Sequence, residues 1–183
     1  DVLNFNGDFL LYIGDLRAGE RLKRKAMLLD PLAWVHAKDM GTILGAQGRF
    51  VEAVAVDKLG AATGYQGSLN QLLRDQLALK QFDEAQRTLD RVCQGRDSRS
   101  KLCLKSKAHF LAGTGRIEDA RVAMASMVRD FPPATGREHA LAAATYANYL
   151  DDIASATKSL RTSLMEPGGI PTIVLLTPSR GAL

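Results

Sequence analysis

Histidine is the side chain most often used for metal binding and proton transfer near neutral pH, and this chain of 183 residues has three. They are His36, His109 and His139, and no two of them stand four residues apart around a carboxylate, as in a helical zinc site. The sequence also lacks the glycine-rich loops that hold nucleotide phosphates and the G-x-S-x-G turn of serine hydrolases. We therefore predict that the chain is not an enzyme and carries no metal or cofactor.

The two cysteines, Cys93 and Cys103, lie ten residues apart. We expect two reduced thiols in the core, because free cysteine packs as a small hydrophobic residue and cytoplasmic proteins keep their thiols reduced. The alternative is a disulfide bond between them, which would indicate an oxidising compartment such as the bacterial periplasm.

Two groups of basic residues could attract phosphate groups. We interpret both as solvated surfaces, because no aromatic side chains for base stacking are interleaved with them and the net charge is only +4. Nucleic-acid binding is the weakest alternative. The first group is Arg21, Lys23, Arg24 and Lys25, and the second is Arg91, Arg96, Arg99, Lys101, Lys105 and Lys107.

The composition indicates a helical protein of ordinary solubility, since 46% of the residues are hydrophobic and 24% are charged. Alanine and leucine far outnumber the β-branched residues, which favours an all-α fold. No apolar run is long enough to cross a membrane, so we expect no membrane insertion. The first residues lack a signal-peptide pattern and an initiator methionine, which suggests a fragment of a longer protein.

An internal repeat organises the chain. Short apolar or aromatic markers recur at intervals of 34, 32, 35 and 36 residues: Leu16, Phe50, Phe82, Ile117 and Ile153. Apolar residues recur every three or four positions on both sides of each marker, which predicts a helix before it and a helix after it. Gly14, Gly48 and Gly115 stand just before three of the markers and favour tight turns there.

This pattern resembles the tetratricopeptide repeat (TPR), a pair of antiparallel helices of about 34 residues. The resemblance implies a right-handed all-α solenoid of about five hairpins at residues 1–33, 34–65, 66–100, 101–136 and 137–168. After Gly168 and Gly169 the chain contains the apolar run Ile173-Val174-Leu175-Leu176. We interpret residues 169–183 as a tail that caps the last hairpin.

The TPR resemblance also implies a concave groove lined by the first helix of each hairpin. Its register places there a set of polar and basic residues that could bind an acidic peptide, with apolar anchors beside them. These candidates are Tyr12, Lys38, Thr42, Asn70, Arg74, Leu77, Lys105, His109 and Asn148. The family's clamp for C-terminal carboxylates is missing, because Lys38 is followed by Thr42, then Gln71, then Leu102 and Ser106.

The run Leu11-Tyr12-Ile13-Gly14-Asp15-Leu16, with Asp30-Pro31 and His36 after it, also resembles the TPR regions of large bacterial signalling proteins. Those proteins carry adenylate cyclase, winged-helix or kinase output domains. The resemblance implies a cytoplasmic, non-enzymatic scaffold or sensory module that binds a peptide or a partner domain. The alternatives are a self-association module that forms homo-oligomers and a periplasmic domain of a larger protein.

Overall fold

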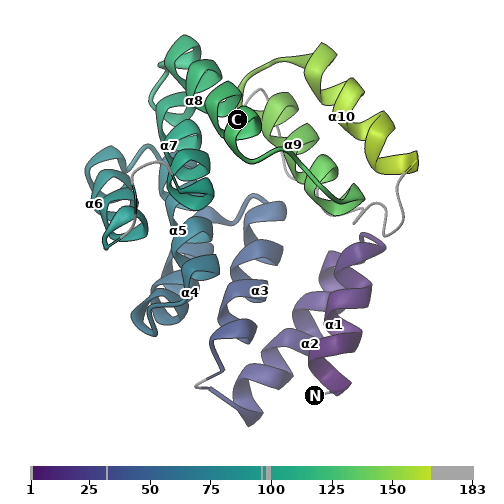
Figure 1. The fold of residues 1–183 in the computed structure, drawn as a ribbon. Helices are drawn as coiled ribbons and strands as arrows, with labels where there is room; N and C mark the ends of the chain where they lie inside the picture. The colour runs from purple at the N-terminus through teal and green to yellow at the C-terminus, as the bar shows by residue number, and fades with distance from the viewer. Residues whose placement is uncertain (1, 32, 96, 98–99, 166–183) are drawn as a thin grey trace. The chain divides into compact units, whose positions relative to one another are not determined.

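The structure is a computed structural model that describes residues 2–31, 33–95, 97 and 100–165. Within these residues the chain holds ten α-helices and no strand (Figure 1). This confirms the predicted all-α fold of helical hairpins, whereas the proposed cap at 169–183 lies outside the described residues. The helices are α1 Val2–Tyr12, α2 Leu16–Leu29, α3 Trp34–Ala46, α4 Phe50–Ala62, α5 Gln66–Ala78, α6 Phe82–Cys93, α7 Lys101–Gly113, α8 Ile117–Asp130, α9 Gly136–Tyr149 and α10 Ile153–Met165.

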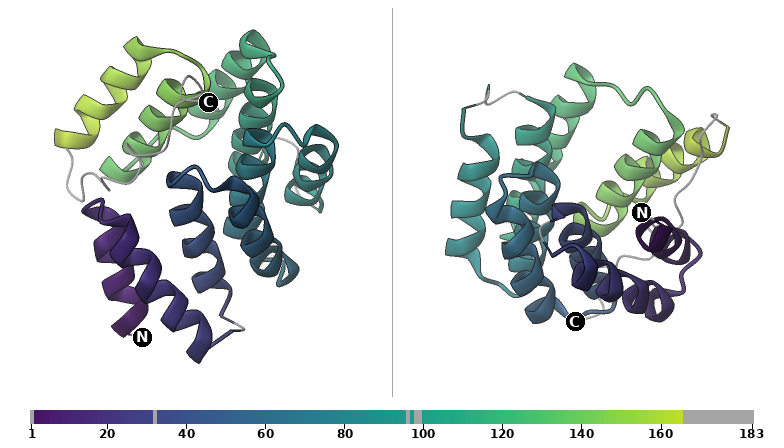
Figure 2. Two further views of the ribbon diagram at one scale, coloured as in Figure 1. Left: turned by 180° about the vertical axis from the view of Figure 1, so that it is seen from behind. Right: turned by 90° about the horizontal axis from the view of Figure 1, so that it is seen from below.

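The helices form two compact units, Asp1–Gln94 with α1 to α6 and Gly95–Leu183 with α7 to α10. Consecutive helices pair into hairpins, as the two further views also show (Figure 2). In the N-terminal unit, α3 packs on α2 and α5 packs on α4, so each hairpin is covered by the next. No described helix is both long enough and apolar enough to span a lipid bilayer.

Each predicted marker residue begins the second helix of a hairpin, and the residue that allows the turn lies just before it. Gly14, Gly48 and Gly115 have φ angles of 86°, 75° and 86°. The third and fifth turns use Lys80 and Asp151 in the same left-handed region, with φ angles of 57° and 50°. Side chains with a Cβ atom are disfavoured in this region, so these two turns are held by the helices on either side.

Two glycines on first helices make room for charged side chains from second helices. A Cβ atom at Gly41 on α3 would lie 1.8 Å from Oδ1 of Asp57 on α4. A Cβ atom at Gly7 on α1 would lie 2.9 Å from Cε of Lys23 on α2. Both charged side chains are fully buried, so the close approach of each helix pair depends on the missing side chain.

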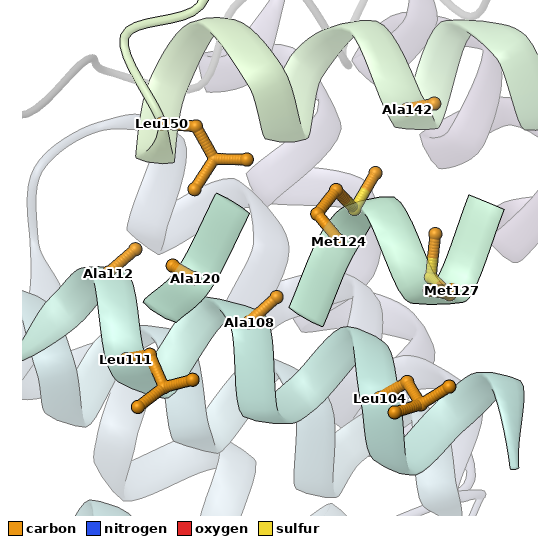
Figure 3. Close-up of a cluster of buried hydrophobic side chains, with 9 residues drawn as sticks. All are labelled: Leu104, Ala108, Leu111, Ala112, Ala120, Met124, Met127, Ala142 and Leu150. Atoms are coloured by element: carbon orange, nitrogen blue, oxygen red, sulfur yellow. The ribbon is translucent and has the colours of Figure 1, made fainter. Parts of the chain in front are cut away.

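The C-terminal unit has an apolar core of the kind that the repeat pattern predicts. Met124 and Met127 of α8 lie in one apolar cluster with residues of α7 and α9, and their flexible side chains can adapt to the small alanines of that cluster (Figure 3). The unit is therefore held by hydrophobic packing. The buried core residues are Leu104, Ala108, Leu111 and Ala112 of α7, Ala120, Met124 and Met127 of α8, and Ala142 and Leu150 of the α9 region.

Candidate functional site

The residues predicted to line a groove are divided between the two units. The N-terminal unit places Tyr12 on α1, Lys38 and Thr42 on α3, and Asn70, Arg74 and Leu77 on α5. Lys105 and His109 lie on α7 and Asn148 lies on α9, in the C-terminal unit. Since α3 and α5 lie against each other, the structure brings the α3 and α5 residues of the first set together.

The α3 and α5 candidates occupy equivalent positions in successive hairpins. Lys38 and Asn70 stand twelve residues before their turn markers, and Thr42 and Arg74 stand eight residues before them. All four side chains are half-buried. Residues at the same position in stacked repeats share one side of the stack, so these four form a partly accessible polar surface. We call it the α3/α5 face.

Lys38 on this face is already paired. Its Nζ lies 2.5 Å from Oδ1 of Asp39, and its backbone carbonyl accepts a hydrogen bond from Oγ1 of Thr42 at 3.0 Å. Burial alone would lower the pKa of Lys38, but the Asp39 carboxylate outweighs it and raises the pKa above its usual value. Lys38 therefore remains an ammonium group, with its charge largely balanced from within the unit.

Lys23 is the centre of an ionic network beneath this face, and the prediction that it belongs to a solvated basic surface was wrong. Its side chain is 0% exposed. Nζ donates to Oδ1 of Asp8 at 2.6 Å, to Oδ2 of Asp39 at 2.6 Å, and to Oδ1 and the backbone oxygen of Asn4 at 2.6 Å and 3.1 Å. The ammonium group thus joins the first helices α1 and α3 through the second helix α2.

The charges of this network compensate one another. Burial would raise the pKa of Asp39, but the two ammonium groups of Lys38 and Lys23 lower it below its usual value. His36 extends the network, because its Nδ1 lies 3.0 Å from the Asn4 Oδ1 that also accepts from Lys23. An oxygen acceptor at that distance requires the proton on Nδ1, which we infer from this contact.

A second buried polar group lies beneath Arg74. Both carboxyl oxygens of Asp57 lie in the interior with no well-formed hydrogen bond to the described residues. Burial, and then the neighbouring carboxyl of Asp75, raise the pKa of Asp57 to about 10, although the Arg74 guanidinium acts in the opposite direction. Asp57 is therefore neutral at pH 7, while Asp75 accepts a hydrogen bond from Nε2 of Gln71 at 3.0 Å.

Two groove candidates lie in the packed interior instead of on an accessible surface. Leu77 is a core residue of α5, so it offers no anchor to a ligand. His109 is buried in the C-terminal unit, where its Nε2 lies 3.4 Å from Oγ1 of Thr145. Lys105 remains half-buried on α7. In the part of the chain that the structure describes, no cluster of side chains could hold a metal ion.

The expectation of two reduced thiols was also wrong. Neither cysteine is free, and both Cys93 and Cys103 are disulfide-bonded. Disulfides persist in oxidising compartments and are rare in the reducing cytosol.

We expect thiol titration of the denatured protein, purified without reductant, to find no free thiol groups, because both cysteines are oxidised. After reduction the same titration should find two. Two free thiols before reduction would show that the bond does not form in the source compartment.

Neither the family models nor the curated proteins contain a match to this sequence. Solved structures do match. MamA residues 41 to the end from Desulfovibrio magneticus RS-1 is 16% identical over 90% of this chain and 92% of its own, with a TM-score of 0.57. MamA AMB-1 is 14% identical over 97% and 96%, with a TM-score of 0.52. YrrB, described as a TPR protein with an unusual peptide-binding site, is 18% identical over 94% and 88%, with a TM-score of 0.54. The helical hairpins of this chain therefore have the TPR fold.

Proposed function

We propose that this chain is a non-enzymatic protein-interaction module that binds a peptide segment or a partner domain on the α3/α5 face. The observation that carries the proposal is the repetition of half-buried polar side chains at equivalent positions of neighbouring first helices. Such a surface offers hydrogen-bonding groups at regular intervals along an extended or helical ligand. The similarity in fold to YrrB, which is described as having a peptide-binding site, supports the proposal.

The charges on the face favour a ligand with acidic residues. Lys38 and Arg74 are its two cations, but Lys38 is paired with Asp39 and Arg74 lies close to Asp75. Because an exposed ion pair contributes only about 0.2–1 kcal/mol, acidic residues alone would give weak binding. Apolar anchors on the ligand must supply most of the affinity, as in other interfaces.

We further propose that the module belongs to a larger bacterial signalling protein, as the sequence resemblance implies. The two oxidised cysteines favour the periplasmic alternative over the cytoplasmic expectation. The scaffold role is the same in both compartments, because peptide binding on the α3/α5 face needs no cofactor.

We expect Arg74→Gln to weaken binding of an acidic peptide selected from a peptide array by about two- to fivefold, because it removes from the face a cation whose exposed ion pair contributes at most about 1 kcal/mol. Arg24→Gln is the matched control. Arg24 is about half exposed on α2 and pairs with Glu20 along the same helix, away from the face. Calorimetry at fixed salt would measure both affinities, and thermal melting would confirm that both variants remain folded.

An equal loss in the two variants would place the binding surface elsewhere on the molecule. A steep fall of affinity with salt for a nucleic acid, together with no peptide capture, would favour the nucleic-acid alternative instead.

A further inference from the structure

The first helix of the chain carries a stripe of large apolar side chains exposed to solvent. Their spacing of three and four residues puts the first three on one side of α1, and the fourth lies in the turn directly after the helix. This α1 stripe consists of Val2, Phe5, Phe9 and Ile13, which are between 57% and 75% exposed. Four large exposed hydrophobic residues in one line are a typical mark of an interaction surface.

The repeat positions of Val2, Phe5 and Phe9 are buried in the later first helices of the N-terminal unit. Phe9 stands seven residues before the turn marker of its hairpin. The residues at the same distance from the next two markers are Ile43 on α3 and Asp75 on α5, and both are buried. The positions of Val2 and Phe5 are likewise buried in both helices. The equivalents are His36 and Asp39 on α3, and Ser68 and Gln71 on α5.

These positions are buried because the second helix of the preceding hairpin covers them. Asp39 of α3 binds Lys23 of α2, and Cδ1 of Ile43 lies 3.6 Å from the position of a Cβ atom on Gly19 of α2. Oγ of Ser68 on α5 approaches Gly60 of α4 in the same manner. The α1 stripe is therefore the surface with which a first helix packs on a second helix, and no described helix precedes α1 to cover it.

The last described helix has the complementary surface. On α4, which α5 packs against, the marker Phe50 is partly covered and Val54 and Ala61 are buried. The equivalent residues of α10 are Ile153, Thr157 and Leu164, and all three are exposed. We call them the α10 face. No helix follows α10 within the described residues, so this face lacks the partner that α5 provides for α4.

We propose that the α1 stripe of one molecule docks on the α10 face of a second copy of this chain, in a head-to-tail contact. The contact would repeat between molecules the packing of α3 on α2 and of α5 on α4. Charge does not oppose the contact, because Asp8, the charged residue of α1, is paired with Lys23 of its own chain, and α10 carries Lys158 and Arg161 without an acidic residue. The stripe lies on a different side of its helix from the α3/α5 face positions, so the contact leaves peptide binding open.

Because the two surfaces are unlike, each associated pair still presents one unused surface of each kind. The average mass of the full chain should therefore continue to rise with concentration beyond the mass of a dimer. We expect this rise in sedimentation velocity between about 10 µM and about 500 µM, the range in which interfaces of modest size associate.

The decisive experiment uses two variants that each block one surface. We expect Phe9→Glu and Leu164→Glu to be monomeric when measured alone, because each lacks one half of the contact. An equimolar mixture should form heterodimers and nothing larger, since only the α1 stripe of the Leu164→Glu chain and the α10 face of the Phe9→Glu chain remain. Val122→Glu, which alters an exposed apolar residue of α8, should associate like the unmodified chain.

Three outcomes would overturn the proposal. The unmodified chain could remain monomeric throughout the concentration range. Leu164→Glu could still form dimers alone, which would indicate a symmetric contact of two α1 stripes. The full chain with Leu175→Glu in its tail could associate where the unmodified chain does not, which would show that the chain's own tail occupies the α10 face.

Discussion

Replacing Lys23 by methionine should lower the free energy of unfolding of the N-terminal unit by about 3–5 kcal/mol at pH 7, the usual cost of removing one partner from a buried ion pair. Methionine keeps most of the length and apolar stem of lysine but removes the ammonium group. Asp39 would then remain buried with only Lys38 beside it, and Asn4 and Asp8 would lose a hydrogen-bond donor. Urea denaturation followed by circular dichroism would measure the loss.

The matched control for this variant is Arg24→Met, one residue along the same helix. Arg24 is about half exposed and pairs with Glu20 at 2.7 Å, so its removal should cost less than about 0.5 kcal/mol. A loss of similar size in the two variants would contradict the burial of Lys23. Adding Asp39→Asn to Lys23→Met should recover part of the stability, because it removes the uncompensated carboxylate.

The pH dependence provides a second test of the same network. The pKa of Asp39 is lowered in the folded chain, so its stabilising contribution is present above the usual pKa of an aspartate. That contribution disappears as the pH falls through the lower pKa of the folded state. Because Lys23→Met removes one cause of the lowered pKa, the variant should lose less stability than the unmodified chain on acidification.

The repeat could be predicted from the sequence because backbone geometry repeats with it. The turn at each marker needs a residue that tolerates a positive φ angle, and the spacing of Gly14, Gly48 and Gly115 reveals three of the turns. The turns at Lys80 and Asp151 were found only through their markers. Side chains at these two positions adopt the left-handed conformation because the neighbouring helices, rather than their own preferences, determine the turn.

The ionic network could not be predicted from the basic residues of α2 alone, since Lys23 looks like its exposed neighbour Arg24. The signal lies in the repeat register. Lys23 stands seven residues after its marker, as do Asp57, Leu89 and Met124, and all four are buried. A charged residue at a repeated core position has to find partners among its neighbours, so this alignment could have identified both Lys23 and Asp57.

The state of the cysteines is a different case. A spacing of ten residues is compatible both with two reduced cysteines in the core and with a disulfide bond, and the outcome depends on the compartment in which the chain folds.

The groove candidates show a further limit. Register alone assigns a side of the helix, but Leu77 and His109 are buried through packing that depends on neighbouring hairpins.

Asp57 leads to the opposite prediction from Lys23, since removing its ionisable group should stabilise the protein. Its pKa in the folded chain is raised to about 10, chiefly by burial, whereas an aspartate of the unfolded chain titrates near pH 3.9. A group with a raised pKa contributes its full stability only at pH values below the unfolded pKa. That contribution is lost progressively as the pH rises towards 10.

We therefore expect Asp57→Asn to raise the free energy of unfolding by about 2–4 kcal/mol at pH 7, with little effect at pH 4. Asparagine keeps the size that fits over Gly41 and offers an N–H donor to Asp75. Unlike aspartate at pH 7, it does not have to take up a proton when the chain folds. Urea denaturation at several pH values between 4 and 8 would measure the difference between the variant and the unmodified chain.

Asp90→Asn is the control, because Asp90 is an exposed residue of α6 and its replacement should leave the slope of stability against pH unchanged.

A larger residue at position 57 gives a further comparison. In the next hairpin the position equivalent to Asp57 is occupied by Leu89 of α6. The position equivalent to Gly41 is occupied there by Leu73 of α5, so that helix pair is built around larger side chains. Because α3 and α4 approach each other over Gly41, Asp57→Leu should crowd this contact and gain less stability than Asp57→Asn, although it too removes the ionisable group. A constant difference between Asp57→Asn and the unmodified chain from pH 4 to pH 8 would show that Asp57 does not retain its proton in the folded protein.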